Sequence, residues 1–314
     1  IGLLVLAVYV TCLPPTVTGD DSGELIAAAH TLGIPHPHGY PLWCLAAHPF
    51  TWLPWGTVAT RVALSSAVYA AATVSVLFLL LRMLTRSPLA GFAAATGALA
   101  LAFSREFWEQ AIIAEVYALN ALCMAVCLLI LLGWHARRSR GDTHADRMLY
   151  GFAAVYGFSL GNHYTMVVLG PVFALFILLV HGGPRGHVRT YAGMVALAFA
   201  LAFLVFLYLP LRSLADAPVD WGNAGTLQNW WLVVRRKQYA FMFSQYERGL
   251  ERLLRQLAVY GRFWLREFTP WVGGAGLVGL GLLWRRRRGY AALLLLIALL
   301  VPAVFAYVQN FNFT

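Results

Sequence analysis

Residues 62–81 read VALSSAVYAAATVSVLFLLL, which is twenty consecutive positions without a charged side chain. Arg61 and Arg82 stand at the two ends of this run. About 20 apolar residues in an α-helix are enough to cross the hydrocarbon core of a bilayer. The stretch therefore predicts a membrane-spanning helix, and it sets the class of the whole chain.

The composition of the chain agrees with this prediction. Of 314 residues, 60% are hydrophobic and 11% are charged, whereas soluble domains average about 25% charged residues. This excludes an ordinary soluble enzyme and a disordered chain. The net charge of +10 is better explained by membrane topology than by nucleic acid, which we do not expect as a partner. We expect an all-α integral membrane protein with one domain over residues 1–314, truncated at both ends.

Nine apolar stretches are candidate spans, at 1–13, 62–81, 88–103, 111–133, 148–159, 164–181, 191–211, 268–284 and 290–309. Four of the connections between them are rich in Arg, around residues 82–86, 137–147, 185–189 and 285–288. With nine spans, these four connections fall on one side of the membrane. The positive-inside rule makes that side the cytoplasm.

The opposite side receives two long loops, 14–60 and 212–267, and most of the carboxylates. Eleven of the 13 acidic residues fall there, and only Asp142 and Asp146 do not. Solubility alone does not demand this split, so it indicates a working face outside the cytoplasm. The Arg-rich, Lys-poor composition suits a bacterium with a GC-rich genome. We therefore expect the bacterial cytoplasmic membrane, with the site facing the periplasm or exterior.

The first long loop carries an acidic motif that predicts catalysis. It reads Asp20-Asp21-Ser22-Gly23-Glu24-Leu25. Ser22 is expected to cap a short helix with Glu24 in its first turn. A carboxylate near a bilayer is costly unless it is solvated or paired, so we interpret this group as holding a general base. A helix cap with solvated charge, or a cation site, is the alternative.

The same loop continues with a proline-rich motif, His36-Pro37-His38-Gly39-Tyr40-Pro41-Leu42. Two histidines near three acids also allow zinc, although no ligand spacing enforces it. We favour a rigid substrate-binding loop.

The second long loop begins at Arg212, at the outer end of a span. A guanidinium there is well shaped to hold a phosphate through two hydrogen bonds. Asp220-Trp221-Gly222-Asn223 follow, and Arg235-Arg236-Lys237 form a second basic cluster. Residues 246–264 place apolar side chains at helical spacing opposite a stripe of Arg. This predicts a helix lying in the membrane interface, or a solvated face on a domain helix.

Polar residues also occur in or near the spans. On a helix running on from Ser104, Glu115 would lie about 9 Å below Glu109, and an acid at that depth is functional by default. A salt bridge to Arg105 or Arg212 is the alternative. The remaining candidates for the outer face are the turn Gly161-Asn162-His163 and the terminal pair Asn310 and Asn312.

Together these motifs resemble domain-of-unknown-function family 2723, also called glycosyltransferase family 117, the transmembrane protein O-mannosyltransferase-like group. The motifs follow the family's order over nearly the whole chain: Asp21-Ser22-Gly23-Glu24-Leu25, His36 to Leu42, Trp108, Glu115-Val116-Tyr117, Gly161-Asn162-His163, Tyr208 to Arg212, Asp220 to Asn223, Gln238-Tyr239 and Asn310-Phe311-Asn312. His38 stands where the family usually has Pro, and Asp20 adds an acid that is usually absent.

The resemblance implies a GT-C glycosyltransferase that takes a sugar, mannose in this group, from a polyprenyl-phosphate carrier. The acceptor would be a hydroxyl, such as Ser or Thr of a protein, and the sugar carbon would invert. It implies Asp21 as the base, Glu24 orienting it or the acceptor, Arg212 on the leaving phosphate, and no metal or cofactor. The substrate contacts would come from Asp20, His36, His38, Tyr40, Glu115, Tyr117, Asn162, His163, Arg212, Asp220, Trp221, Asn223, Gln238 and Tyr239.

Three other functions fit the same residues. A transporter or flippase for an anionic or lipid-linked solute would also use intramembrane acids and Arg. A non-enzymatic scaffold would not depend on Asp21. A transferase acting on a glycolipid or polysaccharide would differ only in its acceptor.

Overall fold

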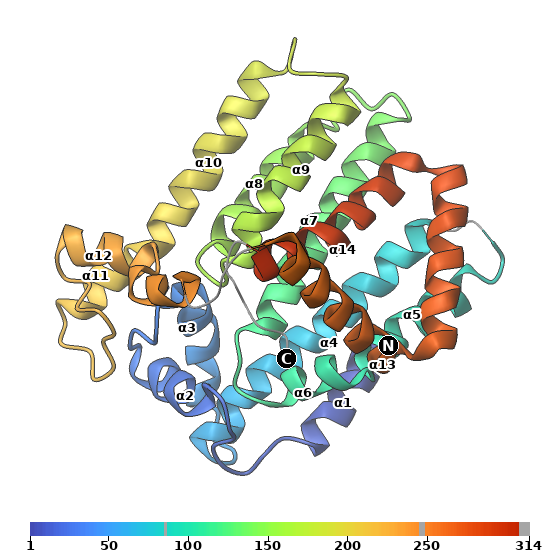
Figure 1. The fold of residues 1–314 in the computed structure, drawn as a ribbon. Helices are drawn as coiled ribbons and strands as arrows, with labels where there is room; N and C mark the ends of the chain where they lie inside the picture. Colours follow the sequence, from blue (N-terminus) through green and yellow to red (C-terminus); the bar gives the residue numbers. More distant parts are fainter. Residues whose placement is uncertain (85–86, 245–248, 308–314) are drawn as a thin grey trace. The chain divides into compact units, whose positions relative to one another are not determined.

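The computed structural model describes residues 1–84, 87–244 and 249–307, and these residues fold into helices joined by short connections (Figure 1). This confirms the predicted all-α class. The elements are α1 (Gly2–Thr11), α2 (Ser22–Thr31), α3 (Pro41–Ala47), η1 (His48–Trp52), α4 (Val58–Leu84), α5 (Ala90–Ala102), α6 (Arg105–Ile112), α7 (Tyr117–Arg138), α8 (Arg147–Ser159), α9 (Thr165–His181), α10 (Val188–Phe206), α11 (Tyr208–Ser213), α12 (Leu227–Val234), η2 (Lys237–Ser244), α13 (Leu250–Arg286) and α14 (Arg288–Tyr307).

Four helical segments in the described part of the chain are long and apolar enough to cross a membrane: Val58–Leu84, Tyr117–Arg138, Val188–Ser213 and Arg288–Phe305. The protein is therefore an integral membrane protein. The predicted count of nine spans is not confirmed. Three of the other apolar stretches form helices of only 10–17 residues: Gly2–Thr11, Ala90–Ala102 and Thr165–His181. Such lengths fall short of the roughly 20 residues that a single crossing needs.

The helices pack into two compact units, one made of residues 1–164 and 188–236 and the other of 165–187 and the described part of 237–314. In the first unit, α4 packs against α7, α5 and α1. The buried face of α4 carries small side chains, among them Ala63, Ala67 and Ala70. Small side chains let helix backbones approach closely, which is how helices associate in lipid.

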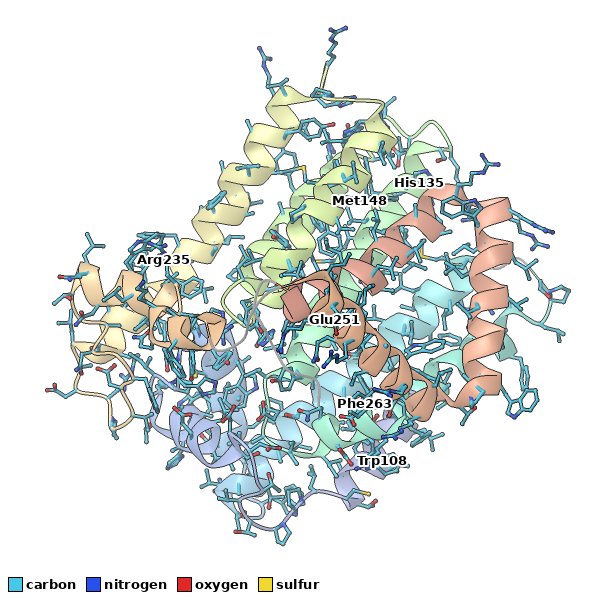
Figure 2. The ribbon with its side chains drawn as sticks, viewed as in Figure 1. Trp108, His135, Met148, Arg235, Glu251 and Phe263 are labelled. Carbon is cyan, nitrogen blue, oxygen red and sulfur yellow. The ribbon has the colours of Figure 1, made fainter. Side chains whose placement is uncertain are left out.

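The first unit has two chemically distinct ends. Asp146, at the start of α8, accepts hydrogen bonds from Trp134 and Arg138 at the end of α7. At the other end, the side chain of Asn162 donates to the carbonyl of Val116, just before α7 begins. His135 and Met148 (labelled in Figure 2) belong to the basic end of this helix pair. The motifs of the first long loop lie at the opposite end.

Close contacts fix the packing of the neighbouring helices. A Cβ added at Gly157 of α8 would lie 2.5 Å from the carbonyl oxygen of Ala198, so α8 and α10 meet where only glycine fits. Trp108 of α6 (Figure 2) packs edge-on against Tyr9 of α1, with ring centroids 5.7 Å apart. The hydroxyl of Tyr9 donates to the carbonyl of Ala102, which ties α1 to the end of α5.

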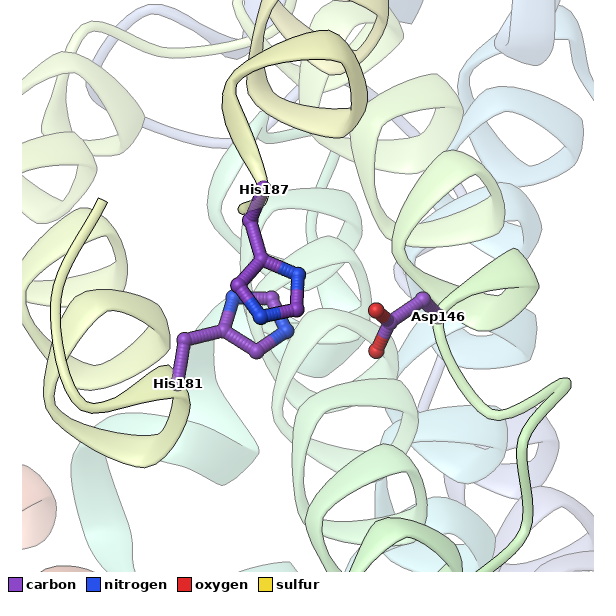
Figure 3. A group of neighbouring side chains, drawn as sticks. All are labelled: Asp146, His181 and His187. Carbon is purple, nitrogen blue, oxygen red and sulfur yellow. The ribbon is translucent and has the colours of Figure 1, made fainter. Parts of the chain in front are cut away.

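The second unit contains α9, η2, α13 and α14. Helix α13 breaks at Thr269, whose φ is +58°. Pro270 follows and has no N–H to donate. The predicted amphipathic helix over 246–264 and the predicted span at 268–284 lie in the two halves of α13, from Leu250 onward, and the second half is not among the four segments that meet the criteria for a span. Tyr246, Glu247 and Arg248 lie outside the described residues. After α9, His181 and His187 stack with ring centroids 3.7 Å apart (Figure 3).

Candidate active site

The acidic motif forms the start of α2, and two of its acids, Asp20 and Asp21, are exposed to solvent. Asp21, not Ser22, occupies the N-cap position, and it makes no side-chain capping bond. The predicted Ser22 cap is wrong because Ser22 is buried and its hydroxyl donates to the carbonyl of Ala114. The Asp21 side chain is 58% exposed. It is therefore accessible to a substrate that arrives from water.

Glu24, one turn into α2, is bound to His36. One carboxylate oxygen accepts from the backbone N–H of His36 at 2.7 Å, and the other lies 2.9 Å from the ring Nδ1. The second ring nitrogen, Nε2, lies 2.9 Å from the hydroxyl of Tyr40 and 3.7 Å from Asp21 Oδ2. A carboxylate bound to one nitrogen fixes the orientation and tautomer of an imidazole. Glu24 therefore orients His36, which in turn faces Asp21.

The same three residues are the candidate metal ligands of this end of the chain. The ligand atoms of Asp21, Glu24 and His36 all lie within 4.8 Å of one another. One imidazole and two carboxylates suit a divalent cation. Both ring nitrogens of His36 are, however, already within hydrogen-bond distance of Glu24 and Tyr40. A cation would have to replace one of these contacts, so the absence of a metal stays a prediction.

A tie between the two long loops holds this cluster in place. The segment that leads into His36 forms a parallel bridge between Ile34 and Asp220. The Ile34 N–H donates to the Val219 carbonyl at 2.6 Å, and the Trp221 N–H donates to the Ile34 carbonyl at 3.0 Å. The second loop therefore fixes the backbone of the first just before the proline-rich motif that begins at His36.

Arg212 belongs to the same tie. Its Nε donates to the carbonyl of Leu32 at 2.6 Å and its Nη2 to that of Thr31 at 3.1 Å. Helix α2 ends at Thr31, and Leu32 has the left-handed conformation typical of a helix C-cap. The last carbonyls of a helix lack partners within the helix. Arg212 donates hydrogen bonds to these carbonyls, which is a different role from the phosphate contact predicted for it.

The other predicted residues of the second loop shape its backbone or face solvent. Asp220 accepts a hydrogen bond from the Ser213 hydroxyl at 2.6 Å. Asn223 has φ of +47°, and its carbonyl accepts from the side chain of Asn229. The side chain of Trp221 is half exposed. Trp221 and Asn223 are therefore the exposed side chains of this motif.

Glu115 lies in a break between two helices. α6 ends at Ile112 and α7 begins at Tyr117, so the predicted continuous helix is wrong. The Glu115 carbonyl accepts from Trp43 at 3.0 Å and from Ser66 at 3.2 Å, which stabilises the break. Its side chain is 4% exposed, and burial raises the pKa of the carboxyl to about 7, with the negative charges of Asp21 and Asp20 acting in the same direction.

The two arginines considered as salt-bridge partners of Glu115 bind other groups. Arg105 pairs with Glu109 at 3.0 Å, and Arg212 donates to the two carbonyls at the end of α2. The Glu115 carboxylate accepts from the N–H of Val116. Asp20, the remaining acid of the motif, is exposed and has φ of +58°.

Rings of the predicted substrate residues form a continuous row beside His36. Tyr40 stacks on His163 with centroids 6.3 Å apart and an angle of 5°. His163 also meets Tyr117 at 5.4 Å, and His38 meets Tyr40 at 5.1 Å. Burial lowers the pKa of both His38 and His163 to about 3. These two imidazoles are therefore neutral and can exchange hydrogen bonds with sugar hydroxyls.

The comparisons with known proteins match this same region. The profile of the family described as protein O-mannosyl-transferase TMEM260 N-terminal domain matches residues 21–183, just over half of the chain. The chain belongs to this family. The matched range begins at Asp21 and contains Glu24, His36, Glu115 and His163.

Two relatives carry the same description. Protein O-mannosyl-transferase TMEM260 of Mus musculus is 33% identical over 248 residues, which cover 78% of this chain and 35% of that protein. Protein O-mannosyl-transferase tmem260 of Dictyostelium discoideum is 27% identical over 240 residues, covering 72% of this chain and 28% of that protein. The chain thus spans about a third of the length of these curated relatives. No solved structure matches the chain.

Four predicted residues of this TMEM260-family chain lie outside the first compact unit or outside the described residues. Gln238 and Tyr239 belong to η2, in the second compact unit. Asn310 and Asn312 lie outside the described residues. Conversely, no pattern in the sequence indicates that Arg236 stands against the ring row, where it lies over Tyr164. In the sequence it is only the middle of a basic triplet, and no spacing separates it from its neighbours.

Proposed function

We propose that the chain is the catalytic membrane core of a GT-C glycosyltransferase. It transfers a sugar, mannose by analogy with the named relatives, from a polyprenyl-phosphate donor to a Ser or Thr hydroxyl of a protein. The names of the relatives support a transferase. The observation that carries the proposal is the exposed Asp21 carboxylate beside a His36 ring that Glu24 orients.

The reaction is a single displacement at the sugar carbon. The acceptor oxygen forms a bond to C1, the bond from C1 to the phosphate oxygen breaks, and its electron pair leaves with the lipid phosphate. Asp21 takes the acceptor proton during attack, because a neutral hydroxyl is a weak nucleophile. One displacement inverts the sugar carbon. The chain's own residues suffice for these steps, and the proposal includes no metal or cofactor.

The layout of the site suits a lipid-linked donor. Its motifs gather at one end of the first unit, where the polyprenyl chain can remain among membrane lipids while the acceptor arrives from water. The Arg-rich connections support a site on the extracytoplasmic face. The Arg-for-Lys bias of the composition supports the bacterial cytoplasmic membrane as the location.

The test is sugar transfer by the purified full-length protein in liposomes. We would supply labelled polyprenyl-phosphate mannose with peptide, glycolipid and polysaccharide acceptors in separate reactions. We expect label in the peptide, and a loss of about 100-fold or more in Asp21→Asn. Asp216→Asn changes an exposed acid outside the cluster and serves as the matched control.

The other outcomes discriminate between the rival functions. Transfer only to glycolipid or polysaccharide would keep the enzyme and change the acceptor. Labelled lipid that crosses the bilayer without forming product would replace the transferase with a flippase. Wild-type transfer by Asp21→Asn would remove Asp21 as the base, and Asp20→Asn would be assayed next. Loss of transfer on chelation, restored by a divalent cation, would establish a metal requirement and overturn the metal-free proposal.

A further inference from the structure

Arg236 is the cation that stands against the ring row of the site. Its guanidinium carbon lies 4.1 Å from the centroid of the Tyr164 ring, well within cation–π range. Tyr164 tilts onto His163 with centroids 4.5 Å apart, and His163 stacks on Tyr40. The hydroxyl of Tyr40 reaches His36. A row of rings therefore runs from a guanidinium to the carboxylate cluster.

The backbone places Arg236 differently from its neighbour. Helix α12 ends at Val234, and the next residue, Arg235 (labelled in Figure 2), is exposed and lies over Trp231 at 5.5 Å. Arg236 has φ of +55°, and its N–H donates to the carbonyl of Val233. A side chain in this left-handed conformation is uncommon outside glycine. As a result, the Arg235 guanidinium lies over Trp231 and the Arg236 guanidinium lies over Tyr164.

The positive charge of Arg236 acts on the buried part of the site. It lowers the pKa of both His38 and His163, in addition to the larger effect of burial. Both rings are therefore uncharged, and they add no second cation beside the guanidinium. A half-buried guanidinium in this setting favours an anion that accepts its N–H groups.

Two buried polar atoms next to the row lack a partner among the described residues. They are Nδ1 of His38 and Oδ1 of Asn162. His38 Nε2 lies 3.3 Å from the carbonyl of Leu160, so Nδ1 is the acceptor of this neutral ring. Buried polar atoms in folded proteins almost always have a hydrogen-bond partner. Two free acceptors beside a stacked ring pair suit the hydroxyl groups of a sugar.

We propose that Arg236 binds the phosphate of the lipid-linked donor, and that the sugar lies along Tyr40 and His163 toward Asp21. This inference rests on the proposed transferase function and identifies the residue that holds its leaving group. As the bond between the sugar carbon and the phosphate oxygen breaks, the phosphate gains a negative charge. A fixed guanidinium stabilises that charge, while the acceptor proton goes to Asp21.

Arg212, the other candidate for this role, is already committed. Its Nε and Nη2 donate to the carbonyls of Leu32 and Thr31. Turning it toward a phosphate would leave the end of α2 without its cap. Arg236 instead lies over Tyr164, at the end of the ring row.

The test is direct binding of two lipids to the full-length protein in nanodiscs. Polyprenyl phosphate carries the anion, and the matching polyprenol does not. We expect Arg236→Gln to weaken polyprenyl phosphate binding by about 10- to 100-fold and to leave polyprenol binding unchanged. Arg236→Lys should be intermediate, because it keeps the charge and loses the planar fork. Arg235→Gln, one residue away, should bind both lipids like wild type.

The outcomes separate this inference from the proposed function. Wild-type binding of polyprenyl phosphate by Arg236→Gln would overturn it, as would an equal loss for both lipids in a variant that keeps the wild-type unfolding temperature. Inorganic phosphate that competes in the millimolar range only in the wild type would support a phosphate site. If the anion dependence holds and no sugar is transferred, the transferase proposal fails and the phosphate site stands. If sugar transfer occurs and Arg236→Gln retains it, the transferase proposal stands and the phosphate site at Arg236 fails.

Discussion

Glu24 accepts two hydrogen bonds from His36, one from its backbone N–H at 2.7 Å and one from its ring at 2.9 Å. A single carboxylate thus fixes both the main chain and the imidazole of a residue twelve positions away. The second ring nitrogen, Nε2, lies 2.9 Å from the Tyr40 hydroxyl and 3.7 Å from Asp21 Oδ2. In the proposed reaction, Glu24 would therefore act through His36, as a positioning residue.

Glu24→Gln should therefore lower kcat for sugar transfer by about 10- to 100-fold, with donor KM changed by less than threefold. Glutamine can still accept from the His36 N–H, but its amide group faces the ring nitrogen as a donor. Because Glu24 acts through His36, the double variant Glu24→Gln/His36→Asn should be no slower than His36→Asn alone. Multiplying losses in the double variant would show that Glu24 touches substrate directly. Glu251→Gln, an exposed acid in α13, is the control.

Arg212→Gln should reduce stability more than it reduces phosphate binding. It removes two hydrogen bonds from carbonyls at the end of α2 and leaves them unpaired, at about 1–3 kcal/mol for each buried group. We expect a lower unfolding temperature in detergent, and polyprenyl phosphate binding within threefold of wild type at temperatures where the variant is folded. A selective loss of phosphate binding at unchanged stability would return the phosphate role to Arg212.

The local motifs of the site could be predicted because each is short and contiguous. Asp21 and Glu24 share one helical turn, and His36 to Tyr40 are held together by prolines. The family match to residues 21–183 confirms the resemblance that these motifs carry. The role of Arg212 could not be predicted, because its partners at Thr31 and Leu32 lie about 180 residues earlier in the chain.

The break at Glu115 also could not be predicted from the sequence pattern. Residues 111–133 are an apolar run with no proline or glycine near Glu115, so periodicity favours one helix. The helix is interrupted because Trp43 and Ser66, from two other helices, bind the Glu115 carbonyl. Tertiary contacts here override local helix propensity. The kink at Thr269, by contrast, precedes a proline that the sequence displays.

Gly33→Ala should loosen the tie between the two long loops. An added Cβ would lie 2.8 Å from the Cβ of Val219 and 2.9 Å from its carbonyl oxygen, so the backbone would have to shift. That carbonyl accepts the N–H of Ile34, two residues before His36. We expect a lower unfolding temperature and slower sugar transfer. Gly19→Ala is the matched control, because a Cβ there meets nothing within 4 Å. Equal unfolding temperatures and transfer rates for the two variants would show that the contact between the loops does not position His36.

Glu115 should make stability depend on pH. Burial raises its pKa from 4.5 to about 7 in the folded protein, so between these values the folded state keeps a proton that the unfolded chain has lost. Its contribution is fully present below pH 4.5 and is lost as the pH rises to about 7, amounting to about 3 kcal/mol at most. Glu115→Gln stays neutral at every pH. Its unfolding temperature should fall less than that of wild type between pH 5 and pH 8.

The comparison with an exposed acid makes this prediction specific. Glu109 is half exposed and pairs with Arg105 on the surface of α6, so Glu109→Gln should keep the wild-type slope of unfolding temperature against pH. At pH 8 only Glu115→Gln should be more stable than wild type, because only there is a buried charge removed. If both variants follow the wild-type curve, the Glu115 carboxylate is already satisfied as an anion, and its proton has no part in holding the break between α6 and α7.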